Sequence, residues 1–281
     1  MLKNELYERT WFYDLEWVPD AAGAKRLYDL PDETTELEAM EKLWSEASGY
    51  SDECKRPFVK YLFSRVISIA FLSRNVVYRD GERRIEFRLH SLPKLPLEEA
   101  VMDEADIIDR FLHFVGTREP QLVGFNSIDS DLQVLIQRGM VNEVHAPGFN
   151  SRPSERWAKG RDYFNRYEDW HFDLCKLFSN GAMKPKLNDL ARLCGFPGKI
   201  DIDGRQVADL WLAGDLTKIV EYNQIDTLNT YLIWLRAVYF AGKMTEEEYA
   251  VEQDEFREFL YAEAELPEKS HLQKFLSKWE A

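Results

Sequence analysis

The sequence contains little cysteine, and its three cysteines, Cys54, Cys175 and Cys194, form no paired spacing. The pattern gives neither a disulfide framework nor a zinc site, so we expect reduced thiols in a cytoplasmic protein. No apolar run approaches the roughly 20 residues that a bilayer-spanning helix needs, which argues against a membrane protein. The opening MLKNELYERT is charged and polar and does not resemble a secretory signal.

Positive charge is scarce as well, because 36 Lys and Arg stand against 50 Asp and Glu, a net charge of −14. A protein this acidic should not hold nucleic acid through general attraction. Residues 152–199 differ, with 10 basic and 6 acidic residues. A polyanion would therefore have to meet the chain near this middle segment, unless the segment is an ordinary solvated loop.

The apolar pattern predicts an α/β protein with a sizeable core, since 45% of the 281 residues are hydrophobic. Strands are predicted at 10–18, 66–72, 84–92, 121–126 and in the first part of 170–178. Helices are predicted within 20–56 and at 98–115, 130–140, 187–195, 214–242, 245–266 and 271–279. Three antiparallel strands followed by alternating helices and strands are compatible with an RNase H-like fold with a mixed five-stranded sheet, although the pattern alone does not single that fold out.

We expect one domain over residues 1–242 and an acidic helical C-terminal extension over residues 243–281. Within the domain, residues 20–56 are interpreted as an acidic helical insertion, and residues 142–170 as a long basic loop of a kind that is often functional. The extension opens with a Thr-x-x-Glu capping box. It would mediate self-association, dock a protein partner or only cap the fold.

Two carboxylates, Asp14 and Glu16, lie inside the apolar stretch FYDLEWVPD. Residues two apart on a strand share a face, so both point the same way, and unpaired buried charge is costly. Tyr222 and Asp226 share one face of a long helix, and Asp131 begins a helix after an apolar strand. Each feature alone has an ordinary explanation: a surface pair, a core tyrosine beside a solvated acid, and a helix cap.

Four converging acids would repel one another and take up protons unless cations were bound. Carboxylate oxygens are hard ligands that suit Mg²⁺ or Mn²⁺. Two such ions about 4 Å apart can activate water and stabilise a leaving oxygen in phosphodiester hydrolysis. The missing positive charge beside these acids would then be metal.

The order of these motifs resembles the DEDD superfamily of 3′–5′ exonucleases, in the branch with a tyrosine in its third motif. The closest resemblance is to the bacterial family of predicted exonucleases related to the proofreading domain of B-family DNA polymerases. DLEWVPD matches the first motif, GFNSIDSDLQVL the second and YNQIDTLNTYL the third, and HFDL, LCGFPGK and DGRQVADLWLAG also resemble this family. In this chain the motif positions are Asp14 and Glu16, Asn126 and Asp131 (not Asp129), and Tyr222 and Asp226.

The resemblance implies an RNase H-like exonuclease that shortens nucleic acid from its 3′ end and releases nucleoside 5′-monophosphates. Single-stranded DNA is the substrate we expect, although the sequence itself does not distinguish DNA from RNA. It implies that Asp14, Glu16, Asp131 and Asp226 bind two divalent cations, Mg²⁺ or Mn²⁺, while Tyr222 orients a water. The alternatives are an exoribonuclease of the same chemistry, a structure-specific endonuclease, and a catalytically idle module that binds nucleic acid or serves as a scaffold.

Substrate contacts are predicted less specifically, for Asn126, Trp17, Lys184, Lys186, Arg161 and Arg166. Trp17 stands where the family usually has threonine, and it would stack on a base or pack in the core. Ser130 stands where the family usually has an aromatic residue. The basic side chains would contact phosphates or carry ordinary surface charge.

Four further polar residues near the motifs are interpreted as structural. Asp173, in HFDL, could orient its surroundings without binding metal, and His171 is given a structural role. Asp201 and Asp203 lie in DIDG, which is typical of a turn.

Overall fold

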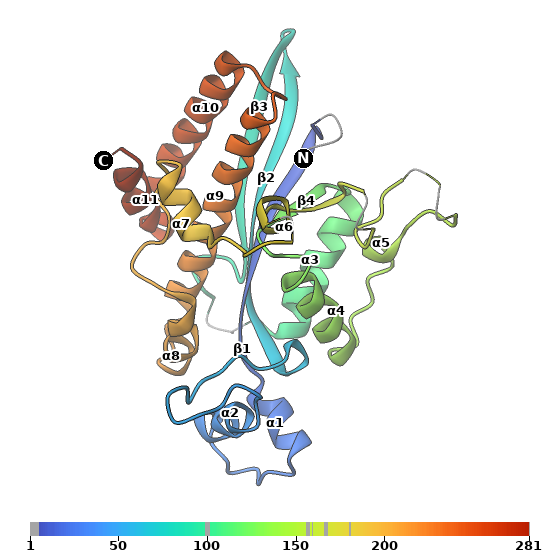
Figure 1. Cartoon of the computed structure of the whole chain (residues 1–281), viewed down its shortest axis with the longest axis vertical. Helices are drawn as coiled ribbons and strands as arrows, with labels where there is room; N and C mark the ends of the chain where they lie inside the picture. The colour runs from blue at the N-terminus through green and yellow to red at the C-terminus, as the bar shows by residue number, and fades with distance from the viewer. Residues whose placement is uncertain are drawn as a thin grey trace.

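A five-stranded mixed sheet forms the centre of the protein (Figure 1). The structure is a computed structural model, and it describes residues 6–98, 102–155, 158, 160–165, 168–179 and 181–280. The strand order is β3-β2-β1-β4-β5. β1 and β3 pair with β2 antiparallel, and β1, β4 and β5 run parallel. The strands are β1 (Arg9–Pro19), β2 (Ser64–Arg79), β3 (Glu82–Leu92), β4 (Gln121–Gly124) and β5 (His171–Asp173). The predicted mixed five-stranded sheet is confirmed.

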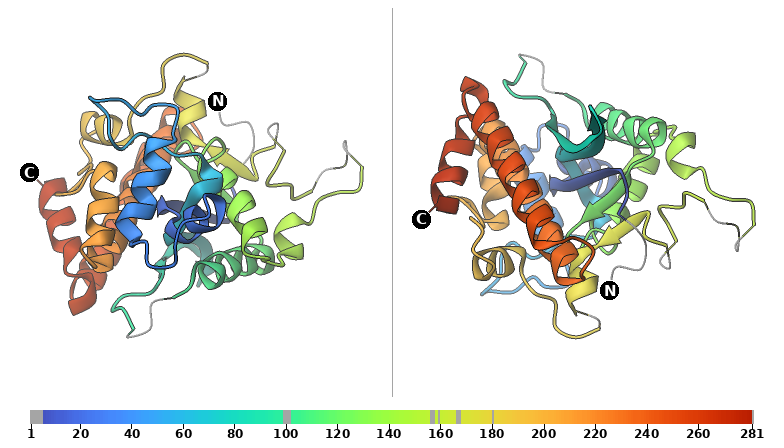
Figure 2. Two further views of the ribbon diagram at one scale, coloured as in Figure 1. Left: turned by 90° about the horizontal axis from the view of Figure 1, so that it is seen from below. Right: turned by 90° about the horizontal axis from the view of Figure 1, so that it is seen from above.

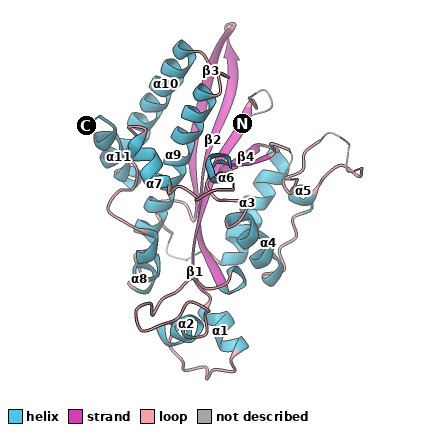
Figure 3. Cartoon of the chain, viewed as in Figure 1, coloured by secondary structure: helices cyan, strands magenta, loops and turns pink. Residues whose placement is uncertain are grey.

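Helices cover both faces of this sheet (Figure 3). Among the described residues they are α1 (Ala21–Leu27), α2 (Glu36–Ser45), α3 (Glu104–Arg118), α4 (Asp131–Val141), α5 (Pro147–Asn150), α6 (Leu174–Ser179), α7 (Leu187–Leu193), α8 (Val207–Leu212), α9 (Leu216–Phe240), α10 (Glu246–Ala264) and α11 (His271–Glu280). The described residues also contain three short 3₁₀ turns: η1 (Tyr61–Phe63) before β2, η2 (Gly204–Gln206) before α8 and η3 (Pro267–Lys269) between α10 and α11. None of these described helices is long and apolar enough to cross a bilayer.

The side chains of β1 alternate between two hydrophobic layers. Trp11 and Tyr13 pack in the cluster that contains residues of α3 and α4, whereas Phe12 packs in the cluster that contains α9. Views from above and below show these two groups of helices on opposite sides of the sheet (Figure 2). Because neighbours two apart share a face, Asp14 and Glu16 point the same way as Phe12, towards α9.

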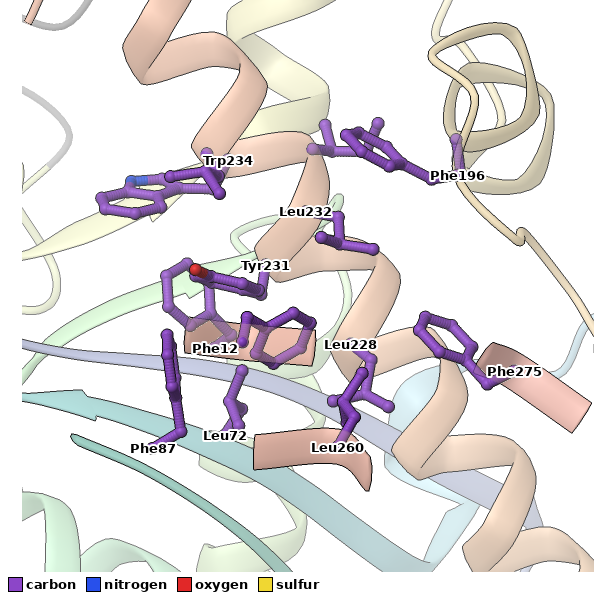
Figure 4. Packing of buried hydrophobic residues seen from close by; sticks show 14 of the residues in the cluster. Phe12, Leu72, Phe87, Phe196, Leu228, Tyr231, Leu232, Trp234, Leu260 and Phe275 are labelled. Carbon is purple, nitrogen blue, oxygen red and sulfur yellow. The ribbon is translucent and has the colours of Figure 1, made fainter. Parts of the chain in front are cut away.

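α9 is fixed on the sheet by large aromatic side chains (Figure 4). The ring centroids of Tyr231 and Trp234 each lie 5.1 Å from that of Phe12, and all three side chains are buried. Phe256 of α10 and Phe275 of α11 belong to the same cluster. The C-terminal helices therefore share the core of the sheet and of α9.

A buried ion pair also joins α10 to the sheet. Arg74 of β2 donates two hydrogen bonds to Glu252 of α10, of 2.5 and 2.8 Å, and neither side chain is exposed. Tyr231 of α9 donates a third, of 3.2 Å, to the same carboxylate. Burying two charges is costly, and these hydrogen bonds offset that cost, while Nη1 of Arg74 has no hydrogen-bond partner among the described residues.

The segment between β1 and β2 holds α1 and α2, which lie at one end of the molecule (Figure 1). Its core residues, such as Trp44, pack with the first turns of α9 around Ile219. At its entry, Asp20 pairs with Arg138 of α4 at 2.9 Å, and Arg138 also donates to Glu104 of α3. This network fixes the segment beside the end of β1 where Asp14 and Glu16 lie.

The structure differs from the sequence-based expectation in several places: β4 ends at Gly124 and not at residue 126, and α5 lies within the predicted loop 142–170. β2 runs from residue 64 to 79, well beyond the predicted 66–72, because its polar second half still pairs with β3. α3 begins at Glu104, capped by Asp103, and not at residue 98. α8 was not predicted, since its two turns directly follow η2 and show little periodicity.

Candidate active site

Three acids from distant parts of the chain converge where β1 faces α9. Asp14, Glu16 and Asp226 each offer a carboxylate oxygen, and these oxygens all lie within 4.8 Å of one another. Asp14 and Glu16 are partly buried and Asp226 is buried. Among the described residues, no histidine or cysteine belongs to this group.

α9 supplies more than Asp226 to this site. Tyr222, one turn earlier, is buried on the same face. The side-chain amide of Asn223 donates a 2.8 Å hydrogen bond to Asp14 and accepts one of 3.1 Å from Ser68 of β2. Sequence reasoning did not single out Asn223, although it stands next to Tyr222. It fixes the Asp14 carboxylate relative to both β2 and α9.

Asp131, the fourth predicted ligand, lies beside the three acids at the N-terminus of α4. Its Oδ1 accepts a 3.1 Å hydrogen bond from the backbone N–H of Leu15, and its Oδ2 accepts one of 2.6 Å from Ser130. In this arrangement Asp131 is outside the 4.8 Å group. Asp129, the alternative in the same motif, faces outward and pairs with lysines.

The acids of the site raise one another's pKa. Burial, followed by the charges of Asp131, Glu16 and Asp226, raises the pKa of Asp14, against the hydrogen bond from Asn223. Burial and the charge of Asp226 likewise raise the pKa of Glu16. Burial raises the pKa of Asp131 to about 7, although hydrogen bonds to its carboxylate oppose the shift. The site therefore has a deficit of positive charge.

Asp226 shows most directly that the group would accept a cation. Its Oδ1 is buried and has no hydrogen-bond partner within the described part of the chain. Burial raises its pKa, which Lys199 and a hydrogen bond from Tyr222 oppose. A buried carboxylate oxygen without a donor is costly unless something positive contacts it. A set made only of carboxylate oxygens suits a hard divalent ion such as Mg²⁺ or Mn²⁺.

Lys199 is a site residue that sequence reasoning missed. Its ammonium donates a 2.5 Å hydrogen bond to the Tyr222 hydroxyl, lies 4.9 Å from the centre of that ring and is 3.8 Å from Oδ2 of Asp226. The segment LCGFPGK resembled the family, but a single lysine there gives no periodic signal. The structure shows that it is the nearest cation to the acid group among the described residues.

A tight turn at Gly198 directs Lys199 into the site. Gly198 has φ +66°, and a Cβ there would lie 2.7 Å from Asn188 and 2.8 Å from Arg192, so glycine is required. Asn229 of α9 accepts from the Gly198 N–H and donates to its carbonyl, both at 3.0 Å. One helix therefore positions Asp226, Tyr222 and the loop that brings the lysine to them.

Asp173 organises the loop of the second motif, as its expected structural role requires. Its carboxylate accepts hydrogen bonds from the backbone N–H groups of Asn126 (2.9 Å), Ile128 (3.0 Å) and Lys176 (3.2 Å). Asn126 has φ +64°, a left-handed conformation that asparagine tolerates. Its side-chain oxygen accepts a 2.8 Å hydrogen bond from Lys184.

His171 lies behind this loop. Its Nε2 is 2.9 Å from both the Tyr13 hydroxyl and Ser127 Oγ. Burial lowers its pKa to about 3, so the ring is neutral. Asp203 caps η2, which agrees with its expected turn role, and Asp201 pairs with Lys274 on the surface.

The remaining predicted substrate contacts lie in different surroundings. Trp17 is half-buried and packs edge-on against Tyr61, and Lys186 is exposed at the start of α7. Arg161 is engaged within the fold, because its guanidinium donates to the carbonyls of Gly116 and Gly148. Arg166 lies outside the described residues.

Comparison with known proteins identifies the family. A family model described as a predicted 3′–5′ exonuclease related to the exonuclease domain of PolB matches residues 56–279, about four fifths of the chain. The matched segment contains Asp131, Tyr222 and Asp226 and begins after β1, which carries Asp14 and Glu16. No curated protein matches the chain. On the strength of this match the chain belongs to the family of predicted 3′–5′ exonucleases related to the exonuclease domain of PolB, as its three motifs predicted.

Proposed function

We propose that the chain is a metal-dependent exonuclease that removes nucleotides one at a time from the 3′ end of single-stranded DNA. The observation that carries the proposal is the group of Asp14, Glu16 and Asp226, with ligand oxygens within 4.8 Å of one another. The family's relation to the exonuclease domain of PolB supports DNA over RNA. The three cysteines are free thiols, which supports a cytoplasmic location.

The four acids, including Asp131 beside the group, would hold two divalent cations, Mg²⁺ or Mn²⁺. Such a pair, when bound, activates a water and stabilises the oxygen that leaves phosphorus. Hydrolysis forms a bond between the water oxygen and phosphorus and breaks the bond from phosphorus to the 3′-oxygen. The 3′-oxygen gains a proton, and a nucleoside 5′-monophosphate is released.

Tyr222 and Lys199 act together in this scheme. Burial and the charges of Asp226 and Glu16 raise the pKa of the Tyr222 hydroxyl, so it keeps its proton at neutral pH. Lys199 donates to the phenol oxygen, and the phenol proton is directed to Asp226. Tyr222 therefore orients the attacking water by hydrogen bonding and does not abstract its proton, while Lys199 adds positive charge where the phosphate develops negative charge.

The terminal nucleotide is held by residues that surround the acids. The Lys184 ammonium donates 2.8 Å hydrogen bonds to the side chains of Asn126 and Asp129, so it places a positive charge beside the second-motif loop. We assign phosphate contacts to Lys184 and Lys186 and a hydrogen bond to Asn126. Trp17 directly follows the acid pair and contacts a base.

The test is digestion of a 5′-labelled single-stranded DNA oligonucleotide in Mg²⁺ or Mn²⁺. The parent should produce a ladder that shortens from the 3′ end, and Asp14→Asn and Asp226→Asn should abolish it. Asp254→Asn is the matched control, since Asp254 is an exposed acid on α10 that pairs, within the described residues, only with Arg257. Digestion by Asp226→Asn at the parent rate would overturn the proposal.

Two further substrates and one binding measurement separate the alternatives. Circular single-stranded DNA is cut only by an endonuclease, and an RNA oligonucleotide of the same sequence identifies an exoribonuclease. Titration calorimetry with Mn²⁺ should show uptake that Asp226→Asn weakens. An idle module would show neither uptake nor digestion.

A further inference from the structure

A short basic and aromatic segment leads into η1, and its charge contrasts with the rest of the protein. Residues 54–66, CKRPFVKYLFSRV, contain four Lys or Arg and no acid, in a chain with a net charge of −14. Aromatic residues alternate with the basic ones. Phe58 is 62% exposed, a large fraction for a phenylalanine.

Three rings, Trp17, Tyr61 and Phe58, form a continuous surface that we call the aromatic platform. The ring centroids of Trp17 and Tyr61 lie 6.0 Å apart and those of Tyr61 and Phe58 5.1 Å apart, both pairs edge to face. Trp17 and Tyr61 are half-buried, whereas Phe58 is the exposed end. Rings held in this way present fixed apolar faces and edges to whatever lies beside them.

The aromatic platform lies on the α4 side of the sheet, where Trp17 and Tyr61 pack against the cluster of α3 and α4 residues, whereas Asp14 and Glu16 face α9. Trp17 follows Glu16 on β1, at a β-bulge where the register with β2 shifts. η1, which carries Tyr61, packs against α4, and α4 begins at Asp131. The charge of Asp131 contributes, after burial, to a raised pKa of the Tyr61 phenol. A strand whose 3′ end sits among the acids could therefore continue over these rings.

The charges around the platform suit a polyanion. Arg56 pairs with Asp209, and Arg65 stacks on Trp211 at 5.2 Å, so both are engaged. Lys60, between Phe58 and Tyr61 in sequence, is exposed, and no described residue forms an ion pair with it. Lys60 is therefore free to contact a phosphate.

We propose that the aromatic platform binds the first two nucleotides 5′ to the scissile phosphate, the first base against Tyr61 and the second against Phe58, with the phosphate between these two nucleotides on Lys60. This inference rests on the proposed exonuclease function and adds the path of the substrate strand. Stacking on aromatic side chains tolerates any base, as a non-specific exonuclease requires. It also explains how an acidic protein holds a polyanion without general attraction.

The other explanation of the rings is that they only fasten the segment containing α1 and α2 to the sheet. That explanation predicts loss of stability when a ring is removed, whereas strand binding predicts loss of affinity only for substrates long enough to reach the ring. Phe58 contributes little to burial because it is mostly exposed, so its removal should leave the fold intact.

The experiment measures KM and kcat of Phe58→Ala and Lys60→Gln on a single-stranded 12-mer and on a dinucleotide. Each variant should raise KM for the 12-mer, Phe58→Ala about tenfold, and leave kcat/KM for the dinucleotide unchanged. Tyr78→Ala is the matched control, because Tyr78 is an aromatic residue 67% exposed at the far end of β2. It should behave as the parent does on both substrates.

A single abasic nucleotide moved along the 12-mer adds a second readout. In the parent it should raise KM at one or two positions near the 3′ end, and Phe58→Ala should be insensitive at those positions. Phe58→Trp should restore the sensitivity, which a purely structural role would not require.

The inference is wrong if Phe58→Ala keeps the parent KM on the 12-mer, or if its kcat/KM falls by the same factor on the 12-mer and on the dinucleotide. Either result can be told apart from failure of the proposed function, which is judged by the activity of Asp226→Asn. Should Phe58→Ala melt well below the parent, the test uses Phe58→Leu and Lys60→Gln, because leucine keeps an apolar side chain and glutamine keeps two methylene groups of the lysine side chain.

Discussion

Replacing Lys199 with methionine should separate cation binding from catalysis. The Lys199 ammonium lies 3.8 Å from Asp226 Oδ2, and at an effective dielectric constant of about 20 two unit charges at that distance interact by about 4 kcal/mol. Because 27% of the lysine side chain is exposed, solvent screening reduces the interaction to about 1–2 kcal/mol. Its removal makes the site more negative, so affinity for Mn²⁺ should stay or rise by up to about tenfold.

Catalysis should change in the opposite direction. Tyr222 would lose the 2.5 Å hydrogen bond that fixes its hydroxyl, and the site would lose its nearest fixed positive charge. Losing one such preorganised group typically lowers kcat by about 10² to 10³. Steady-state digestion of a single-stranded DNA oligonucleotide measures kcat, and calorimetry with Mn²⁺ measures the affinity.

A matched control is available just past the end of the same helix. Lys243 is exposed just beyond the C-terminal end of α9, so Lys243→Met makes the same change in net charge far from the acids. It should keep parental activity. The reasoning is refuted if Lys199→Met retains kcat within about threefold, or if it loses Mn²⁺ binding together with activity.

Two further predictions concern stability. Because the pKa values of Asp14 and Asp131 are raised, these two groups hold protons in the metal-free folded protein that the unfolded chain releases, and their contribution to stability should fall from about pH 4 to pH 7 by about 1.4 kcal/mol per pH unit for one proton. The lowered pKa of His171 contributes in the opposite direction, so the test is the stabilisation that Mn²⁺ adds. Thermal unfolding should show a larger gain from Mn²⁺ at pH 8 than at pH 5, and an equal gain at both would contradict this. Glu252→Gln should cost about 3–5 kcal/mol in urea unfolding, because it leaves the buried Arg74 charge uncompensated. A loss under about 1 kcal/mol would mean that α10 unfolds separately from the sheet.

Urea unfolding of Glu252→Gln also tests the domain organisation. The sequence predicted an extension from residue 243 beside a domain over residues 1–242. We propose that the extension belongs to one cooperative unit with the domain, since Phe256 and Phe275 are buried in the same cluster as β1 and α9. Two separate unfolding transitions would contradict this proposal.

Local chemistry made most of the fold predictable. The long helix was expected from near Asp215 to near Gly242, and α9 runs from Leu216 to Phe240 with Asp215 as its N-cap. The Thr245 capping box at the start of α10 is present. Short elements such as α8 were missed because two turns carry too few residues for a periodic signal. The pairing of Arg74 with Glu252 joins positions 178 apart, and no local pattern indicates it.

The candidate site was predictable where a motif gives the chemistry and its spacing. Asp14 and Glu16 share a face by strand alternation, and Tyr222 and Asp226 by helix periodicity. Lys199 was missed because a turn at Gly198 and a clamp from Asn229 bring it into the site, and both are tertiary features. The aromatic platform was not predicted because the sequence analysis looked for excess positive charge over residues 152–199, whereas the basic stretch at residues 54–66 is short and lies outside that segment.

The contact of Phe12 with Tyr231 and Trp234 has a consequence for how the site fills. Phe12 is two residues from Asp14 on β1, and the two aromatic residues follow Asp226 by one to two turns on α9. The spacing of the carboxylates is therefore set by hydrocarbon packing, whether or not ions are present. A preformed cage of this kind would exchange divalent ions without refolding, so protein stripped with a chelator should regain full activity as fast as manganese can be mixed in.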